Sequence, residues 1–277
     1  MKIKQITSYL ETIAPLSLQE DYDNSGLIIG NEETEVRGAL ICLDCSEAVV
    51  DEAIQKKCNL IIAHHPIIFR GLKKITGKNY VERAVLKAIQ NNIAVYAIHT
   101  NLDNVSNGVN KKICEKLGLS NCKILAVKLP SPRGEGQGVR QGGIQSGSGM
   151  IGTLSKPMTE IAFLKKVKKV FCVKTQNVAF LRYTNLSGKK VSKVAVCGGS
   201  GSFLLNAAMA AKADVFVTSD FKYHQFFDAD NEIVIADIGH YESEQFTKEL
   251  LRDLLNQKFP IFAPHLSKVN TNPVNYL

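Results

Sequence analysis

Apolar residues in the first part of the chain follow two spacings that predict two kinds of element. Ile3, Ile6, Leu10 and Ile13 recur every three or four residues, as on one face of a helix. Short unbroken aliphatic runs, such as residues 39–43, predict buried strands instead. The two patterns alternate, with strands expected at 27–29, 39–43, 59–63, 93–98 and 123–127 and helices at 3–13, 46–57, 81–90 and 109–117. Such alternation indicates an α/β lobe whose sheet is at least partly parallel.

A glycine-rich stretch interrupts this alternation. Seven of the nineteen residues from 131 to 149 are glycine, so we expect a loop or linker there. Beyond it we expect strands at 150–154, 178–181, 191–197, 214–217 and 233–236, a helix at 159–171 and a last long helix at about 240–255. The predicted organisation is a first α/β lobe at 1–128, completed by 237–277, a Gly-rich loop at 129–150 and a second α/β lobe at 151–236.

The formal net charge of +8 is concentrated around the second lobe. Residues 123–193 contain 14 Lys and Arg against 2 Asp and Glu, whereas the rest of the 277-residue chain carries 20 against 24. A basic lobe can bind phosphate groups nonspecifically, but the chain has no Trp and lacks interleaved aromatic residues on which bases would stack. We interpret the lysines as a solvated face and expect no nucleic-acid partner.

The sequence also bears on the compartment. No apolar run approaches the roughly 20 residues of a membrane span, and the polar start of the chain does not resemble a signal peptide. Seven cysteines, an odd number, lie mostly in apolar runs, as expected for reduced thiols in the cytoplasm. Cys42 and Cys45 have C-x-x-C spacing, but Cys42 lies in a predicted strand rather than at a helix N-terminus, and no second pair completes a zinc site. We favour a packing role for both.

The strongest chemical feature is the pair His64 and His65, which follows the aliphatic run 60–63 and precedes Pro66. Ligands of α/β sheets bind outside the carboxyl ends of the strands, and this pair lies at such an end. Two adjacent imidazoles there point to different sides and can reach two metal ions, or one metal ion and a substrate. The alternative is one hydrogen-bonded and one exposed histidine, and the pair alone leaves both open.

Two more polar clusters follow predicted strands. His99 and Asp103 follow the strand at 93–98, and His240 and Glu244, four residues apart on one helical face, follow the strand at 233–236. Each has a structural alternative: a buried hydrogen-bonded imidazole for His99, a cap for Asp103 and a first-turn acid for Glu244. Their shared position at strand ends favours one site. Five residues, His64, His65, Asp103, His240 and Glu244, then offer mixed nitrogen and oxygen ligands that suit two divalent ions such as Zn, Mn, Fe, Ni or Mg.

Two further segments carry candidate binding groups. Residues 197–201 are glycine-rich but lack the endings of the known nucleotide-binding loops, so a tight turn is the favoured interpretation. In residues 218–224, Lys222 and His224 are candidates for binding substrate phosphate or supporting the metal ligands.

Six motifs in order resemble the Nif-three-like family, whose bacterial members are known as GTP cyclohydrolase 1 type 2 homologues. They occupy residues 23–27, 59–66, 99–103, 197–201, 218–224 and 238–244, and the resemblance extends over residues 3–265. It implies a two-lobed α/β subunit, a toroidal homohexamer and a dinuclear metal site facing the central cavity. The family's ligands fall on His64, His65, Asp103, His240 and Glu244, with Glu244 as the bridging carboxylate. Tyr22, Cys45 and Ser219 depart from the family pattern, and none of them is a ligand.

The resemblance implies a metal-dependent hydrolase that acts on a nucleotide-like substrate. In the reaction that the family name suggests, activated water opens the purine imidazole ring of GTP and releases formate. His99 or His224 is then the candidate proton shuttle, and Lys222 or the basic lobe would bind the triphosphate. The alternative is a non-enzymatic ring that stores metal or binds protein partners, because no motif specific to one substrate is present.

Overall fold

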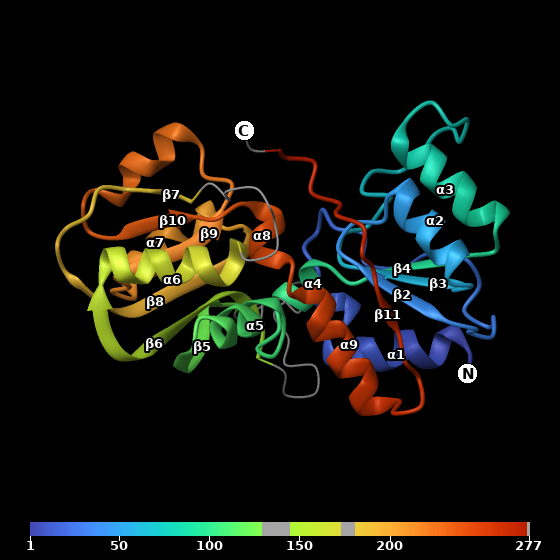
Figure 1. The fold of residues 1–277 in the computed structure, drawn as a ribbon, viewed down its shortest axis with the longest axis horizontal. Helices are drawn as coiled ribbons and strands as arrows, with labels where there is room; N and C mark the ends of the chain where they lie inside the picture. Colours follow the sequence, from blue (N-terminus) through green and yellow to red (C-terminus); the bar gives the residue numbers. More distant parts are fainter. Residues whose placement is uncertain (129–144, 173–180, 276–277) are drawn as a thin grey trace, which may run out of the picture. The chain divides into compact units, whose positions relative to one another are not determined.

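The computed structural model describes residues 1–128, 145–172 and 181–275, which divide into two compact units (Figure 1). Unit 1 comprises Met1–Leu102 and Thr247–Thr271, and unit 2 comprises Asp103–Phe246 and the C-terminal residues from Asn272. Each unit has its own sheet with helices packed on it, which confirms the prediction of two α/β lobes.

The division between the units differs from the expected lobes. Residues 103–128 belong to unit 2 because the strand Leu119–Val127 (β5) pairs with Gly147–Thr159 (β6) in the second sheet. Residues 237–246 also belong to unit 2, and the chain returns to unit 1 at Thr247. Sequence periodicity predicts strands but not which sheet each one joins, so this difference could not be seen in advance.

The sheet of unit 1 is five-stranded and mostly parallel, as predicted. Its order is β1-β4-β3-β2-β11, with β1 antiparallel to β4 and the other neighbours parallel. The strands are Gly26–Ile29 (β1), Ala39–Cys42 (β2), Leu60–Ala63 (β3), Ala94–Ala97 (β4) and His265–Leu266 (β11). The short strand β11 has no counterpart among the predicted elements, because two residues are too few for a periodic signal.

Helices cover both faces of this sheet. In Figure 1, α2 and α3 lie over one face, and α1 and α9 lie over the other. Ser46 caps α2, its hydroxyl accepting the amide hydrogen of Val49 at 3.4 Å. The helices and the short 3₁₀ turn of unit 1 are Ile3–Ile13 (α1), Leu16–Leu18 (η1), Glu47–Gln55 (α2), Tyr80–Gln90 (α3), Thr100–Asp103 (α4, which ends in unit 2) and Thr247–Lys258 (α9).

The sheet of unit 2 is six-stranded and mixed, in the order β5-β6-β8-β9-β10-β7. Strands β8, β9 and β10 are mutually parallel, and the remaining neighbours are antiparallel. The strands after β6 are Arg182–Tyr183 (β7), Lys190–Ser200 (β8), Val215–Ser219 (β9) and Val234–Asp237 (β10). Most of the strand expected at 178–181 lies outside the described residues.

The helices of unit 2 lie on both faces of its sheet, with α5 and α6 on the face opposite α7 (Figure 1). Leu205 and Ala208 of α7 pack against Ala195 and Phe216 in a buried apolar cluster. The helical segments are Val109–Lys116 (α5), Glu160–Cys172 (α6), Ser202–Leu204 (η2), Leu205–Ala210 (α7), Tyr223–Ala229 (η3) and His240–Glu244 (α8).

Two predicted elements of unit 2 are wrong in extent. The Gly-rich loop was expected to run to residue 150, but β6 begins at Gly147, where a Cβ would lie only 2.2 Å from the carbonyl oxygen of Ala126. Glycine at this position therefore permits close strand packing. The rest of the expected loop, up to residue 144, lies outside the described residues. The single helix expected at 240–255 is instead two helices, α8 and α9, separated at Gln245 and Phe246.

The break between α8 and α9 has a local cause. The side-chain Nε2 of Gln245 donates to the backbone carbonyl oxygens of Glu242 and Phe171. The centre of the Phe246 ring lies 5.7 Å from that of Phe171. These contacts hold residues 245 and 246 in unit 2. The apolar residues that follow, Leu251 and Leu255, are fully buried in unit 1.

The two cysteines with C-x-x-C spacing have no features of a redox pair. Cys42 and Cys45 are both buried and free, and burial raises the pKa of the Cys45 thiol to about 12, so a thiolate redox pair is disfavoured. Their burial fits the packing role favoured from the sequence. Among the described residues, no helix has the length and apolar composition of a membrane span.

Candidate metal centre

His64 follows the last residue of β3 and is fully buried. Its backbone N–H still donates to the carbonyl of Cys42, and its ring Nδ1 lies 2.8 Å from the carbonyl oxygen of Ile98. Because a carbonyl oxygen can only accept, Nδ1 carries the proton, and in the neutral ring Nε2 then carries the lone pair. The backbone thus fixes His64 in the form that binds a metal through Nε2.

Two more imidazoles of unit 1 are held by carboxylates. Nδ1 of His65 lies 2.8 Å from Oδ1 of Asp44, and Nδ1 of His99 lies 2.7 Å from Oδ1 of Asp23. The rings of His64, His65 and His99 lie side by side, with centroids 4.9 to 5.3 Å apart. One ring nitrogen from each of the three lies within 4.8 Å of the others, a spacing that allows them to share a metal ion. His99 is therefore part of the histidine cluster of unit 1, which comprises His64, His65 and His99.

Asp23 is held firmly in its charged form. Burial alone would raise its pKa. The hydrogen bonds from His99 and Thr100 lower the pKa by more than burial raises it, so that it lies well below its ordinary value. The carboxylate accepts from the Thr100 hydroxyl at 2.5 Å and from the Ser25 hydroxyl at 3.0 Å. Asp23 therefore gives His99 a fixed, charged partner.

Unit 2 carries a second cluster, at the ends of β9 and β10. Gly239, with φ of +90°, turns the chain from β10 into α8, which presents His240 and Glu244 on one face. Nε2 of His240 lies 3.2 Å from Oε2 of Glu244, and its Nδ1 lies 2.6 Å from Oδ2 of Asp220. Burial lowers the pKa of His240, but the hydrogen bonds to Asp220 and Glu244 raise it more, to about 11.

Glu244 owes its position to a glycine. Gly199 has φ of +63°, and a Cβ on it would lie 2.4 Å from Oε1 of Glu244. Glu244 is 2% exposed, and one of its carboxylate oxygens lies within 4.8 Å of one from Asp103 at the end of α4. The unit 2 cluster, comprising Asp103, His240 and Glu244, thus joins two carboxylates and an imidazole.

The glycine-rich turn 197–201 is occupied by packing contacts. The amide of Gly198 donates to Oδ1 of Asn110, and the amide of Gly199 donates to the hydroxyl of Ser243 in α8. These two amides are therefore used to fix α5 and α8 against the turn. This fits the favoured interpretation of a tight turn.

Lys222 and His224 lie on the surface. Both are exposed at the start of η3, and the His224 ring contacts the ring of Tyr223 at 5.2 Å. They follow Asp220 in the chain by two and four residues, so they lie on the segment that leaves the end of β9. Their roles in substrate binding and proton transfer stay predictions.

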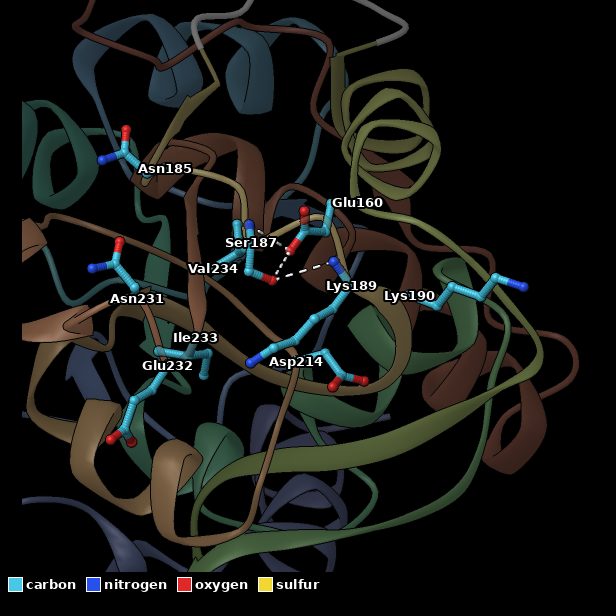
Figure 2. Close-up of a pocket in the computed structure, with 10 residues that line it drawn as sticks. All are labelled: Glu160, Asn185, Ser187, Lys189, Lys190, Asp214, Asn231, Glu232, Ile233 and Val234. Atoms are coloured by element: carbon cyan, nitrogen blue, oxygen red, sulfur yellow. Dashed lines mark hydrogen bonds between the residues drawn. The ribbon is translucent and has the colours of Figure 1, made fainter.

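A small pocket in the basic lobe tests the idea of a phosphate site there. Figure 2 shows Lys189 and Lys190 in its lining together with the carboxylate of Glu160. That carboxylate accepts from the Ser187 hydroxyl at 2.7 Å and from the backbone amides of Ser187 and Gly188. A buried anion already occupies the donors of this loop, which makes the pocket a poor site for phosphate.

Sequence reasoning did not identify the acceptors that hold the imidazoles. Asp44 follows β2 by two residues, and Asp220 directly follows β9. Each of these strands pairs with one that a histidine follows, β2 with β3 and β9 with β10. Their position shortly after predicted strands is the sequence signal by which Asp44 and Asp220 could have been found. Gly199 was noticed in sequence as part of a turn, but its contact with Glu244 depends on the packing of α8 and has no local signature.

Comparisons with known proteins agree with this architecture. Residues 1–273 match the model of the family described as Duf34/NIF3 (NGG1p interacting factor 3). A Clostridium acetobutylicum protein named GTP cyclohydrolase 1 type 2 homolog is 36% identical over 88% of this chain and 85% of its own, and a Campylobacter jejuni protein of the same name is 31% identical over the whole of both chains.

Solved structures show the same fold. A Staphylococcus aureus hypothetical protein is 34% identical, with a TM-score of 0.87 over 100% of this chain and 99% of that one. A Bacillus cereus protein related to NIF3 is 29% identical, with a TM-score of 0.86 and the same coverage. The chain therefore belongs to the Duf34/NIF3 family, as its six motifs indicated.

Proposed function

We propose that this protein binds two divalent metal ions and acts as a metal-dependent hydrolase on a nucleotide-like substrate. One observation carries the proposal: the three histidines among the proposed ligands, His64, His65 and His240, each have Nδ1 within 2.8 Å of a carbonyl or carboxylate oxygen. This arrangement is the usual support of metal-binding imidazoles, because it fixes the ring and directs Nε2 to the metal.

The proposed ligands are His64, His65, Asp103, His240 and Glu244, with Glu244 as the bridging carboxylate. Imidazole and carboxylate groups suit Zn, Mn, Fe, Ni or Mg, and the donor set does not select among them. Bound ions would supply a Lewis acid and would lower the pKa of a water molecule toward neutrality. Buried Glu244 and His64 would hold their positions without rearrangement, because each is fixed by packing or by the backbone.

His99 is the proposed proton shuttle. Asp23 holds its Nδ1, so Nε2 is the nitrogen that can take up or release a proton, and the ring lies beside the rings of His64 and His65. Lys222 and His224 are exposed on η3 and are proposed to contact the phosphates of the substrate or to assist proton transfer.

The name of the bacterial relatives supplies the substrate to test first. GTP cyclohydrolase chemistry would hydrolyse the imidazole ring of GTP and release formate. The decisive experiment combines elemental analysis of the purified protein with an assay for formate after addition of GTP and each metal. The variants His64→Ala and Glu244→Ala should lose metal together with activity. If metal-loaded protein releases no formate from GTP, GTP is excluded as the substrate. A screen of cellular metabolites for turnover would then identify the substrate class.

A non-enzymatic ring protein is the second candidate, and an exposed aromatic groove in unit 2 favours it. Tyr183, Tyr223 and Phe227 line this groove and are 49%, 72% and 68% exposed. Aromatic residues exposed together are typical of protein interfaces. We propose that the groove contributes to a homohexamer in the cytoplasm, and the free cysteines support such a reducing compartment.

The two candidates predict different results. The groove itself is tested by Tyr223→Ser with Phe227→Ser, which should lower the mass measured by light scattering. If the protein is an interaction ring, cells should tolerate loss of the metal ligands. If it is an enzyme, His64→Ala and Glu244→Ala should abolish its cellular function while leaving the assembly intact.

A further inference from the structure

The C-terminal segment of unit 1 is fastened along the edge of the sheet. Strand β11 pairs in parallel with β2, and the amide of Ser267 donates to the carbonyl of Ile41 at 2.8 Å. The Ser267 hydroxyl donates to Oε2 of Glu52 at 2.6 Å, and the amide of Lys268 donates to the same carboxylate. The segment that follows therefore starts from a fixed point.

Four residues after Ser267, the chain reaches the carboxylate that supports His65. The Thr271 hydroxyl donates to Oδ2 of Asp44 at 2.5 Å, and Oδ1 of Asp44 accepts from Nδ1 of His65 at 2.8 Å. The two oxygens of one carboxylate thus have different partners, Thr271 on one side and His65 on the other. Two bonds on opposite oxygens fix the plane of a carboxylate, which otherwise rotates easily about its terminal bond.

The three histidines of unit 1 differ in how their supports are held. His64 uses the backbone carbonyl of Ile98, which cannot rotate independently. His99 uses Asp23, whose side chain is inaccessible to solvent and which accepts a threonine hydroxyl at 2.5 Å. His65 uses Asp44, whose side chain is 39% exposed, so water competes for the carboxylate and its orientation depends more on added contacts.

We infer that Thr271 is a positioning residue for His65, acting through Asp44 to hold the imidazole with its proton on Nδ1 and its lone pair on Nε2. The same device, a threonine hydroxyl 2.5 Å from the carboxylate that holds a histidine, occurs at Asp23 and Thr100. For Asp23 the threonine is Thr100, the residue after His99, and for Asp44 it is Thr271, from the C-terminal segment. The inference rests on the proposed function, because it concerns a proposed metal ligand.

The test uses the full chain and two readouts. In the metal-free protein, long-range ¹H–¹⁵N NMR of the histidine rings should report the Nδ1–H form of His65. The variants Thr271→Val and Thr271→Ala should shift that ring toward a mixture of both forms, whereas Thr271→Ser should match the wild type. Zn²⁺ affinity, measured by competition with a chromophoric chelator, should fall about 3- to 10-fold in the Val and Ala variants, less than the 10- to 100-fold typical of a direct partner of a metal ligand.

Thr12→Val is the matched control, because the Thr12 hydroxyl is exposed on α1 and donates only locally, to the carbonyl of Tyr9 at 2.6 Å. It should change neither the His65 spectrum nor the affinity. If Thr271→Val does not fold, Thr271→Ala carries the same comparison. Unchanged His65 signals and unchanged Zn²⁺ affinity in the folded variant would overturn the role of Thr271. Wild-type protein that binds no Zn²⁺ would instead count against the proposed function, and the NMR comparison would still decide the role of Thr271.

Discussion

The imidazole of His240 lies between two carboxylates, with Nδ1 2.6 Å from Oδ2 of Asp220 and Nε2 3.2 Å from Oε2 of Glu244. The two carboxylates favour the charged form of the ring, and they raise its pKa to about 11 despite the opposing effect of burial. A metal ion that binds Nε2 must displace the proton found there. Asp220 can hold Nδ1 in both states, so its role persists when the metal replaces the proton.

Replacing Asp220 with Asn should weaken metal binding. The amide carries no charge and holds the His240 ring less firmly, so we expect a loss of about 10- to 100-fold in affinity. Titration of Zn²⁺ or Mn²⁺ against a competing chelator measures the change. Asp228→Asn, a substitution at an exposed position of the neighbouring η3 turn, serves as the control and should bind as the wild type does. Equal affinities in the two variants would exclude a role for Asp220 in supporting a metal ligand.

The charged His240 predicts how the stability of the metal-free protein depends on pH. Its folded pKa of about 11 lies above the unfolded value of about 6.5. Between these two values the folded state binds more protons than the unfolded chain, so this contribution is complete below about pH 6.5 and is lost as the pH rises toward 11. Urea unfolding of wild type and His240→Gln, both treated with chelator, should show a difference in free energy that shrinks from pH 6 to pH 10. A difference that stays constant over this range would contradict the raised pKa.

Gly199 should not tolerate a side chain. Alanine at this position would adopt a left-handed backbone conformation, which costs about 1–2 kcal/mol, and its Cβ would lie 2.4 Å from Oε1 of Glu244. We therefore expect Gly199→Ala to lower both stability and metal affinity, because Glu244 has to move. Gly188→Ala separates the two effects, since Gly188 also has a positive φ, of +77°, but no atom within 4 Å of the added Cβ. That control should lose stability and retain metal affinity.

The parts of the site that could be read from sequence are those encoded by short segments. His64 and His65 follow an aliphatic run, and His240 and Glu244 share a helical face, so local periodicity places all four at strand ends. Asp44 and Thr271 are 227 residues apart. The pairing of β11 with β2 and the hydrogen bonds of Ser267 and Lys268 to Glu52 bring them together. That contact depends on tertiary packing, which no local pattern encodes.

The same limit explains the errors in the fold. The apolar spacing from residue 240 to 255 continues through Gln245 and Phe246, so periodicity predicts one helix. The break arises because Gln245 and Phe246 contact Phe171, a residue more than seventy positions earlier in the chain. Helices and strands were thus predicted correctly where buried residues follow the local repeat. The prediction was wrong where the chain passes from unit 2 to unit 1, between Phe246 and Thr247.

Glu52 should be the main acid-sensitive anchor of the C-terminal segment. Burial raises its pKa, but the hydrogen bonds from Ser267 and from the amide of Lys268 lower it more, so its folded pKa lies below the ordinary value. The stabilisation is therefore present above the unfolded pKa of about 4.3 and is lost as the pH falls through the folded pKa. Glu52→Gln replaces one accepting oxygen with an NH₂ group that cannot accept, and we expect it to cost about 1–3 kcal/mol at neutral pH.

Chemical unfolding at pH 7 and pH 3 tests this expectation. The free-energy difference between wild type and Glu52→Gln should be large at pH 7 and smaller at pH 3, because protonation weakens the same contacts in the wild type. Glu32→Gln is the matched control, since Glu32 is 54% exposed and its side chain pairs with Lys4 at the surface. It should change stability by less than about 0.5 kcal/mol at pH 7. If Glu52→Gln also changed stability by less than about 0.5 kcal/mol at pH 7, the pairing of β11 with β2 alone would hold the C-terminal segment. The fixed point from which Thr271 reaches Asp44 would then lie in β11.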